Sequence, residues 1–161
     1  MEGIRIVEIP KCKMVSSGEI LEDEAGKEFF DGKFSKWFGN LPIDLFPRDF
    51  LLHNPKKNTL VWYYALPEKS NIDTMDFELV DFPGGLYAAA VSIDGNDADG
   101  IRIFNGIKEW VEKSGCFELD ERENHDHMFN IITSSKAKEC MGYEQLEIYV
   151  PIKQKLQKSM G

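Results

Sequence analysis

The chain has 161 residues, of which 42% are hydrophobic, 12% aromatic and 29% charged. These values are typical of one globular domain with its own core, and they exclude a collagen-like chain, a long disordered chain and a disulfide-stapled miniprotein. The 28 acidic and 19 basic side chains leave a formal charge of −9, which would repel a phosphate backbone, so nucleic acid is not expected as a direct ligand.

The cysteines and the N-terminus indicate where the protein resides. Cys12, Cys116 and Cys140 are odd in number and widely spaced, so they are predicted to be reduced thiols. Residues 1–5 lack the basic and apolar regions of a signal peptide, and no window approaches the ~18 uninterrupted apolar residues of a membrane span. We therefore expect a cytoplasmic protein with no membrane partner.

The first third of the chain predicts a strand, a helix and a long loop. Residues 4–15 are mostly apolar and predict a strand that bends or restarts at Pro10. An acidic stretch then leads into an amphipathic helix that ends at Gly39. Residues 41–58 contain three prolines and predict a packed loop at the edge of a ligand cleft. The apolar face of the helix would comprise Phe30, Phe34, Trp37 and Phe38.

The middle of the chain predicts three strands and a second helix. Residues 60–66 and 77–82 are rich in aromatic and branched side chains, and a third strand, residues 86–91, follows a break at residues 83–85. After a turn at residues 94–97, apolar positions with helical spacing predict a helix that ends at Gly115.

The C-terminal part predicts two more strands, residues 128–133 and 143–151, joined by a short polar linker. The order strand, helix, strand, strand thus occurs twice, and Trp37 and Trp110 lie at matching places on the two helices. We predict a single α+β domain formed by two pseudo-repeats, about residues 1–83 and 84–153, with a frayed tail at 154–161. Its antiparallel sheet would carry two helices on one face and a central ligand cleft.

Signature motifs for common cofactors are absent from the sequence. It has no G-x-G-x-x-G, Walker, H-E-x-x-H or G-x-S-x-G motif, so we expect no cofactor. His125 and His127 could share one face of a strand and bind a metal. No third ligand lies at a familiar spacing, so the prediction is no metal site and a solvated strand start.

Aromatic residues provide a stronger signal. Alternation along a strand would place Trp62 and Tyr64 on one face and Tyr63 on the other. Such rings most often pack in a hydrophobic core. Together with two tryptophans on the predicted helices and with further tyrosines, they could also line a flat, partly polar cleft. The residues proposed to line it are Trp37, Trp62, Tyr64, Tyr87, Trp110 and Tyr149.

Glu147 is the acidic residue with the most informative position. It shares one strand face with Tyr149, whereas Leu146, Ile148 and Val150 share the other. Periodicity alone favours a solvent-facing carboxylate. If Glu147 instead faces an aromatic cleft, it lacks a partner, and a ligand cation would supply one.

Three segments resemble the GyrI-like small-molecule-binding domains: residues 5–10 (RIVEIP), 82–88 (FPGGLYA) and 146–152 (LEIYVPI). These are effector-binding domains of AraC-type and multidrug-responsive bacterial regulators, and they also occur as free-standing proteins. The resemblance implies a tandem strand-helix-strand-strand fold with a cleft between the halves. It also implies that the ligand-facing glutamate is Glu147, with Tyr149 beside it.

The resemblance leaves three functions open. The regulators carry a DNA-binding domain ahead of this module, whereas this chain starts at its first predicted strand, so a direct role in transcription is not expected. A free-standing binder of a hydrophobic, cationic or electrophilic aromatic molecule is the first hypothesis. Some free-standing relatives hydrolyse cyclopropane-bearing toxins, so a hydrolase that uses Glu147 is the second. The third is an adaptor that binds gyrase or a DNA-binding subunit through its aromatic strand, and a homodimer is compatible with each.

Overall fold

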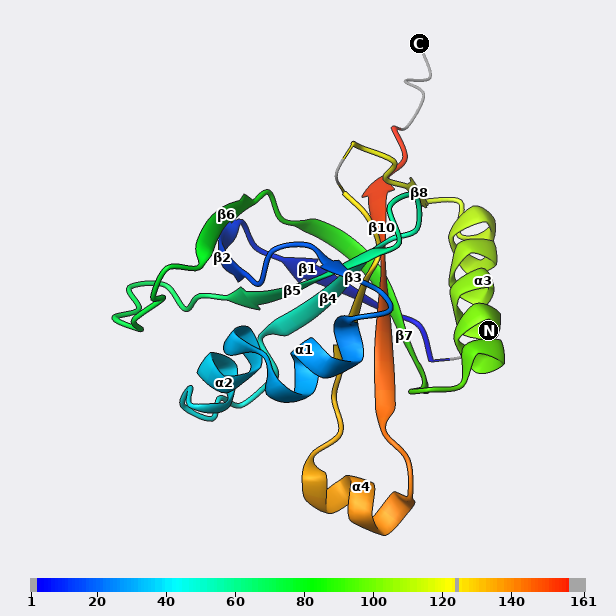
Figure 1. The fold of residues 1–161 in the computed structure, drawn as a ribbon. Helices are drawn as coiled ribbons and strands as arrows, with labels where there is room; N and C mark the ends of the chain where they lie inside the picture. The colour runs from blue at the N-terminus through cyan, green and yellow to red at the C-terminus, as the bar shows by residue number, and fades with distance from the viewer. Residues whose placement is uncertain (1–2, 124, 157–161) are drawn as a thin grey trace. The chain divides into compact units, whose positions relative to one another are not determined.

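The computed structural model describes residues 3–123 and 125–156, which contain four α-helices and ten β-strands (Figure 1). The chain divides into two compact units. Among the described residues, unit 1 comprises residues 3–9, 84–123, 125–127 and 131–156, and unit 2 comprises residues 10–83 and 128–130. Strand pairing within each unit is antiparallel, so the fold is α+β, as predicted.

Unit 1 consists of a small sheet with a long helix along one face. Its elements are β1 (Arg5–Ile9), β7 (Gly85–Ile93), α3 (Asp97–Lys113), β8 (Phe117–Leu119), α4 (Ser135–Met141) and β10 (Gln145–Gln154). Strand β7 pairs with β1 on one side and with β10 on the other, and β8 pairs with β10. Figure 1 shows α3 alongside β7 and β10, which it contacts.

Asn96, in the turn predicted at residues 94–97, caps the N-terminus of α3. The Asn96 side chain accepts a hydrogen bond from the Asp99 backbone N–H at 3.0 Å, and acidic residues in the first turn suit the positive end of the helix dipole. The buried face of the helix is Ile103, Ile107 and Val111. Ile148 and Val150 are buried on β10, and the expected alternation puts them on the face opposite Glu147.

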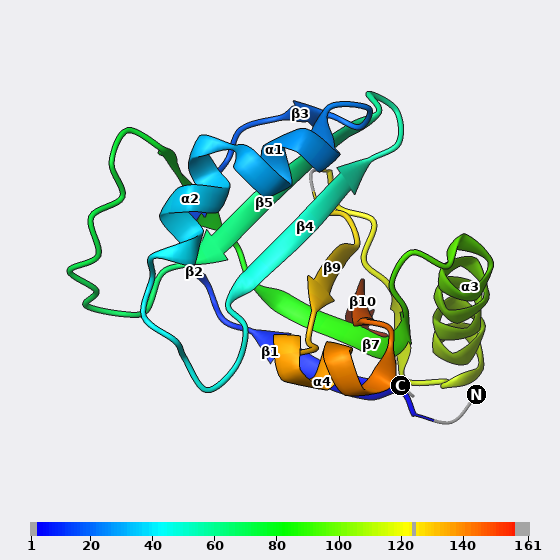
Figure 2. The same cartoon turned by 60° about the horizontal axis from the view of Figure 1, so that its bottom comes forward.

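Unit 2 consists of a sheet covered by two short helices. Its elements are β2 (Cys12–Ser16), β3 (Ile20–Leu21), α1 (Ala25–Asp31), α2 (Lys33–Gly39), β4 (Asp49–Asn54), β5 (Thr59–Ala65), β6 (Glu78–Phe82) and most of β9 (Met128–Ile131). Figure 2 shows α1 and α2 over one face of β5. The core between these helices and the sheet contains Val15, Phe34, Trp37 and Tyr64, with Trp62 packed against it.

The single helix predicted before Gly39 is wrong in one respect, because it is broken at Gly32. This glycine is extended (φ −70°, ψ 163°) and lies so close to the Glu28 carbonyl oxygen that a side chain would collide with it. The break rotates the first turns, so Phe30 is 89% exposed, and Phe29 packs edge-on against Trp62 instead. The predicted apolar face therefore holds from Phe34 onward but not at Phe30.

The loop predicted at residues 41–58 is also wrong, because β4 occupies its second half. Strand β4 pairs along its whole length with β5, and that pairing buries Phe50. The apolar side chains ahead of it, Ile43, Leu45 and Phe46, are exposed rather than packed. Helix α4 replaces part of the predicted polar linker, with Ser134 as its N-cap and Gly142 (φ 80°) at its C-terminal end.

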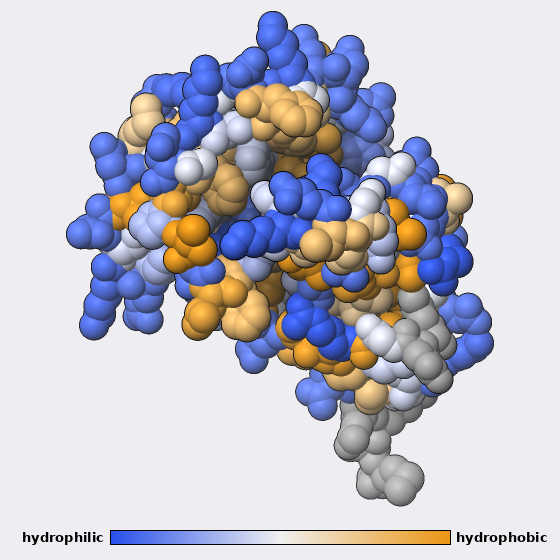
Figure 3. All heavy atoms as spheres, turned by 90° about the horizontal axis from the view of Figure 1, so that it is seen from below, coloured by the Kyte–Doolittle hydropathy of each residue, from blue (hydrophilic) through white to orange (hydrophobic). Residues whose placement is uncertain are grey.

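The remaining sequence expectations concern the surface and the tail. The space-filling view shows hydrophilic side chains around most of the outline with apolar ones among them (Figure 3). Among the helices in the described part of the chain, none has the length and apolar character that crossing a membrane requires. Strand β10 extends to Gln154, and residues 157–161 of the predicted tail lie outside the described residues.

The two phenylalanines on either side of the helix break provide a test of the unit 2 core. Phe34→Ala should lower the free energy of unfolding by about 3 to 5 kcal/mol, because it removes a ring that is 1% exposed from among Trp37, Trp62 and Phe77. Phe30→Ala should change it by no more than about 0.5 kcal/mol. Urea unfolding of both variants gives the comparison, and similar losses would contradict the break at Gly32.

Candidate functional site

The face of the unit 1 sheet opposite α3 carries a group of polar and aromatic side chains. Residues directly opposite each other on antiparallel strands point to the same face. Ala89 on β7 lies opposite Arg5 on β1 and Tyr149 on β10, and Glu147 lies opposite Val91. The register therefore places Arg5, Glu147 and Tyr149 on this face, which we call the Glu147 face.

Glu147 is a buried carboxylate with an arginine partner. Its side chain is 3% exposed, and Arg5 Nε donates a hydrogen bond to Oε1 at 2.6 Å, with Nη2 also 2.6 Å from that oxygen. The expectation of a partnerless Glu147 is thus wrong, because the chain supplies its own cation. The solvent-facing alternative is also wrong, because the Glu147 side chain is buried. A carboxylate charge at this depth needs the pairing that Arg5 provides.

Tyr149 completes this group. Burial raises the pKa of its hydroxyl, and the neighbouring Glu147 charge together with a hydrogen bond to Glu147 raises that pKa further. The phenol therefore stays protonated and can donate to the carboxylate. Arg5, Tyr149 and Glu147 form a connected set in which one negative charge is shared by a guanidinium and a phenol.

A second buried polar group lies beside Tyr87. Arg122 Nε is 3.1 and 3.0 Å from the two carboxylate oxygens of Asp120, and Arg122 Nη2 is 3.2 Å from His125 Nε2. Because arginine only donates, the imidazole Nε2 accepts and His125 is neutral. The Tyr87 ring lies 5.6 Å from the imidazole and 6.3 Å from the Tyr149 ring, so the aromatic rings connect the two polar groups.

Gly85 lies beside this second group in a backbone conformation that calls for glycine. Its φ of +145° is open only to glycine, and a Cβ there would lie 3.4 Å from Arg122 Nη2 and 3.6 Å from His125 Nε2. The sequence marked residues 83–85 only as a break between strands. In the structure Gly85 also begins β7 next to the Arg122 guanidinium and the His125 imidazole.

The two histidines considered as metal ligands point to different partners. His125 contacts Arg122, whereas the His127 ring packs on Phe104 at a centroid distance of 4.9 Å. They lie in the segment before β9 rather than on a strand, so alternation does not align them. Within residues 3–123 and 125–156, no cluster of three or more histidine, cysteine or acidic side chains is arranged to hold a metal ion.

Three of the predicted aromatic site residues pack in the core of unit 2. Trp62 and Tyr64 share the helix-covered face of β5, as alternation predicts, and Tyr64 contacts Trp37 edge-on at 5.7 Å. The indole N–H of Trp37 donates to the Asp73 carbonyl, and that of Trp62 donates to the Asp49 carboxylate, each at 2.8 Å. Core packing and internal hydrogen bonds therefore account for these residues, and a role in ligand contact stays a prediction.

The other predicted residues belong to unit 1. Tyr87 and Tyr149 lie on the Glu147 face, whereas Trp110 is half-buried and stacks on Phe117 of β8 at 6.4 Å. The structure thus joins Glu147, Tyr149 and Tyr87. It adds Arg5 and the Asp120–Arg122–His125 group, which sequence reasoning did not place there. The register of β1 on β7, which brings Arg5 to Glu147, has no signal in a single sequence.

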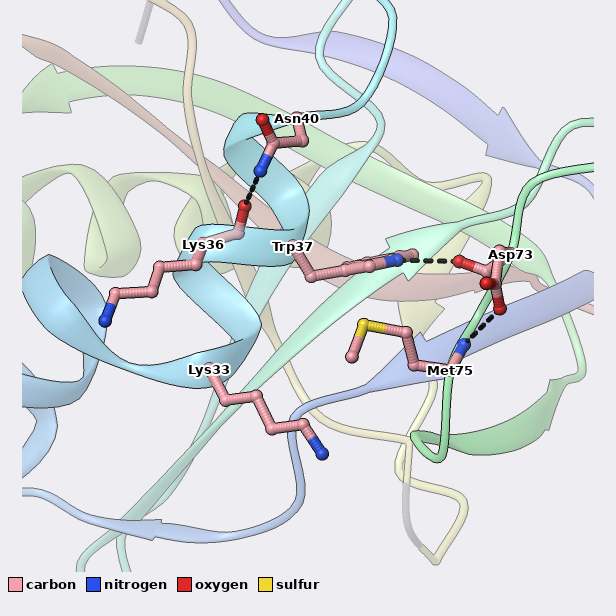
Figure 4. A pocket seen from close by; sticks show the side chains of 6 residues that line it. All are labelled: Lys33, Lys36, Trp37, Asn40, Asp73 and Met75. Carbon is pink, nitrogen blue, oxygen red and sulfur yellow. Dashed lines mark hydrogen bonds between the residues drawn. The ribbon is translucent and has the colours of Figure 1, made fainter.

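A separate cavity of about 380 Å³ lies beside Trp37 in unit 2 (Figure 4). Lys33, Lys36, Trp37, Asn40, Asp73 and Met75 line it. Two of its polar groups have partners within the chain: Lys33 pairs with Asp76, and the Trp37 indole donates to the Asp73 carbonyl. The Glu147 face is therefore the stronger candidate, because it holds buried charge.

Neither a protein family model nor a curated protein matches this sequence. Solved structures do share the fold. SAV2435 bound to tetraphenylphosphonium has a TM-score of 0.59 and 8% identity over 95% of this chain and 94% of its own. The EcmrR C-terminal domain has a TM-score of 0.60 and 14% identity over 94% of this chain and 98% of its own.

A hydrolase from Listeria innocua is similar as well, with a TM-score of 0.60 and 14% identity over 94% of this chain and 92% of its own. At these identities the likeness establishes the fold. The chain has the GyrI-like fold that the sequence resemblance implied.

The buried imidazole predicts a pH-dependent stability. Burial and the Arg122 charge lower the pKa of His125, against smaller opposing effects of Asp120 and Asp126. The unfolded chain therefore binds a proton more readily as the pH falls below about 6.5, so the folded state loses stability there. The pKa of Asp120 is also lowered, with burial outweighed by Arg122, but its effect begins only near its unfolded pKa of about 4.

The wild type should therefore lose free energy of unfolding between about pH 7.5 and pH 5, and His125→Gln should lose less over the same range. Urea unfolding of both proteins across that pH range gives the comparison. His127→Gln, two residues away on Phe104, should retain the wild-type slope. Equal slopes in all three proteins would contradict a neutral His125 buried against Arg122.

Proposed function

We propose that this protein binds a small hydrophobic molecule, cationic or electrophilic and aromatic, on the Glu147 face, as a sensing or sequestering module. A carboxylate, two phenols and their rings provide charge, hydrogen bonding and flat apolar contact for such a ligand. The role corresponds to that of effector-binding domains of multidrug-responsive regulators.

The burial of Glu147 is the observation that carries this proposal. A fold does not need a carboxylate within a strand whose other buried members are apolar, and replacing a buried ion pair by apolar residues is often neutral or stabilising. Charge would also sort ligands strongly, because attraction at 4 Å contributes ~4 kcal/mol at an effective dielectric near 20, whereas one buried methylene contributes ~0.8 kcal/mol. A cation over an aromatic face adds up to ~2 kcal/mol.

The structural neighbours support the same conclusion. SAV2435 was solved with tetraphenylphosphonium, an aromatic cation, and the EcmrR domain is part of a protein also solved with DNA. This chain covers 57% of the EcmrR chain in that DNA complex. Ligand contacts of Trp37, Trp62, Tyr64 and Trp110 stay predictions from the sequence, whereas Glu147, Tyr149 and Tyr87 are the contacts proposed on the Glu147 face.

A hydrolase is the second candidate, favoured by the Listeria innocua hydrolase of the same fold. Glu147 would orient or deprotonate water, and Tyr149 would donate a hydrogen bond to the developing negative charge. An electrophilic substrate, such as a cyclopropane-bearing toxin, would suit this pair.

Glu147→Gln tests the binding site, because it keeps the shape of the side chain and removes its charge. Binding of tetraphenylphosphonium, measured by titration calorimetry, should weaken five- to 150-fold, the equivalent of about 1 to 3 kcal/mol. Tetraphenylborate has nearly the same shape and the opposite charge, so its binding should not weaken.

Glu118→Gln is the matched control, since Glu118 is a half-exposed carboxylate on β8 of the same unit. It should leave both titrations unchanged. Equal responses of the cation and the anion to Glu147→Gln would remove Glu147 from the site.

Mass spectrometry after long incubation of an electrophilic cyclopropane with substoichiometric protein distinguishes the two candidates. We expect the intact compound, as for a binder. A water adduct in excess of protein, lost by a factor of about 10² to 10⁴ in Glu147→Gln, would establish the hydrolase instead.

A further inference from the structure

We propose that Arg5 is a specificity-determining residue: an internal counter-ion that occupies Glu147 in the free protein and that a cationic ligand must displace. This inference rests on the proposed function, since it concerns ligand binding at Glu147. It assigns to the first strand a role in ligand selection.

The contact geometry suits displacement. Both Arg5 nitrogens that reach Glu147, Nε and Nη2, lie 2.6 Å from the same oxygen, Oε1. In the strongest arginine–carboxylate pairs, two nitrogens bind two oxygens in parallel. Arg5 therefore lacks the bidentate fork geometry that holds an arginine most firmly.

The burial of the two partners is unequal. The Arg5 side chain is 58% exposed and Glu147 is 3% exposed. Among the described strands of unit 1, β1 pairs with β7 alone, so Arg5 lies on an edge strand of that unit. The guanidinium can rotate into water, where it is fully hydrated, while the carboxylate stays in place. The pair thus opens from the arginine side.

A second arginine in the same unit shows the contrasting arrangement. Arg122 is 52% exposed over the buried Asp120, similar in exposure to Arg5, but its Nε reaches both carboxylate oxygens and its Nη2 also contacts His125. These contacts tie Arg122 to two side chains. Exposure alone therefore does not make an arginine displaceable. Arg5 also reaches two side chains, Glu147 and the Tyr149 hydroxyl, so what distinguishes it is that both of its nitrogens meet a single oxygen of Glu147.

Exchange of one cation for another has a consequence for ligand selection. A cationic ligand can replace Arg5 without leaving the buried carboxylate unpaired, whereas a neutral ligand cannot. The apparent affinity for any cation is proportional to the fraction of protein in which Arg5 has left Glu147. Arg5 would thus exclude weak cations and admit those with enough aromatic surface to compete.

Arg5→Met tests this directly, because methionine removes the charge and retains an extended side chain. Binding of tetraphenylphosphonium should tighten about 10- to 100-fold, the range expected when a charge-assisted hydrogen bond stops competing. Tetraphenylborate should bind no tighter. Arg5→Lys should bind the cation within a few-fold of the wild type, and Arg102→Met, which removes a surface arginine paired with Asp99 on α3, should leave both probes unchanged.

A measurement on the unmutated protein keeps the test valid if Arg5→Met folds poorly. The Nε–H resonance of Arg5 in ¹⁵N-labelled wild type should shift, and exchange faster with water, when tetraphenylphosphonium is added. Tetraphenylborate should not produce this change, and the Arg122 Nε–H resonance should remain unaffected by either probe.

The outcomes separate this inference from the proposed function. If Glu147→Gln weakens cation binding while Arg5→Met does not tighten it and the Arg5 resonance does not move, the inference fails and the binding site stands. Weaker binding in Arg5→Met would make Arg5 part of the ligand site and would also overturn the inference. If the wild type and Glu147→Gln treat both probes alike, the proposed function fails, and this inference fails with it.

Discussion

A charged carboxylate removed from water must be paired, and in this protein that requirement links strand β1 to strand β10. Glu147 on β10 is paired by Arg5, 142 residues earlier on β1, with β7 between the two strands. The pair is possible only because both strands meet β7 in registers that bring the two side chains to one face. The candidate site depends on this pairing.

The two faces of the unit 1 sheet have different roles: one packs apolar side chains, and the other carries the polar candidate site. On one face, Ile103, Ile107 and Val111 of α3 pack against apolar positions of β7 and β10. That packing allows the opposite face to hold groups that contribute little net stability or cost some. The Glu147 face and the neighbouring Asp120–Arg122–His125 group each pair a buried carboxylate with a half-exposed arginine.

Unit 2 shows how an aromatic strand can resemble a binding site in sequence and form core in structure. Trp62 and Tyr64 share a face, as a ligand-lining pair would, but α1 and α2 cover that face, and Phe34 and Trp37 pack against it. Large aromatic rings bury much apolar area, and their polar edges are satisfied here by Asp49 and Asp73. The sequence pattern of these residues thus fits both a ligand-lining strand and a core strand, and the position of the covering helices distinguishes the two.

Local patterns in the sequence determined most of the secondary structure and the faces of its strands. Alternation separated Glu147 and Tyr149 from Ile148 and Val150, and capping residues marked α3, because both depend only on near neighbours. Tertiary structure alone decided that Glu147 is buried and that Arg5 is its partner. It also decided that β4 pairs with β5 and that the helix breaks at Gly32. These features depend on strand register and on contacts between distant segments, and a single sequence carries no periodic signal for either.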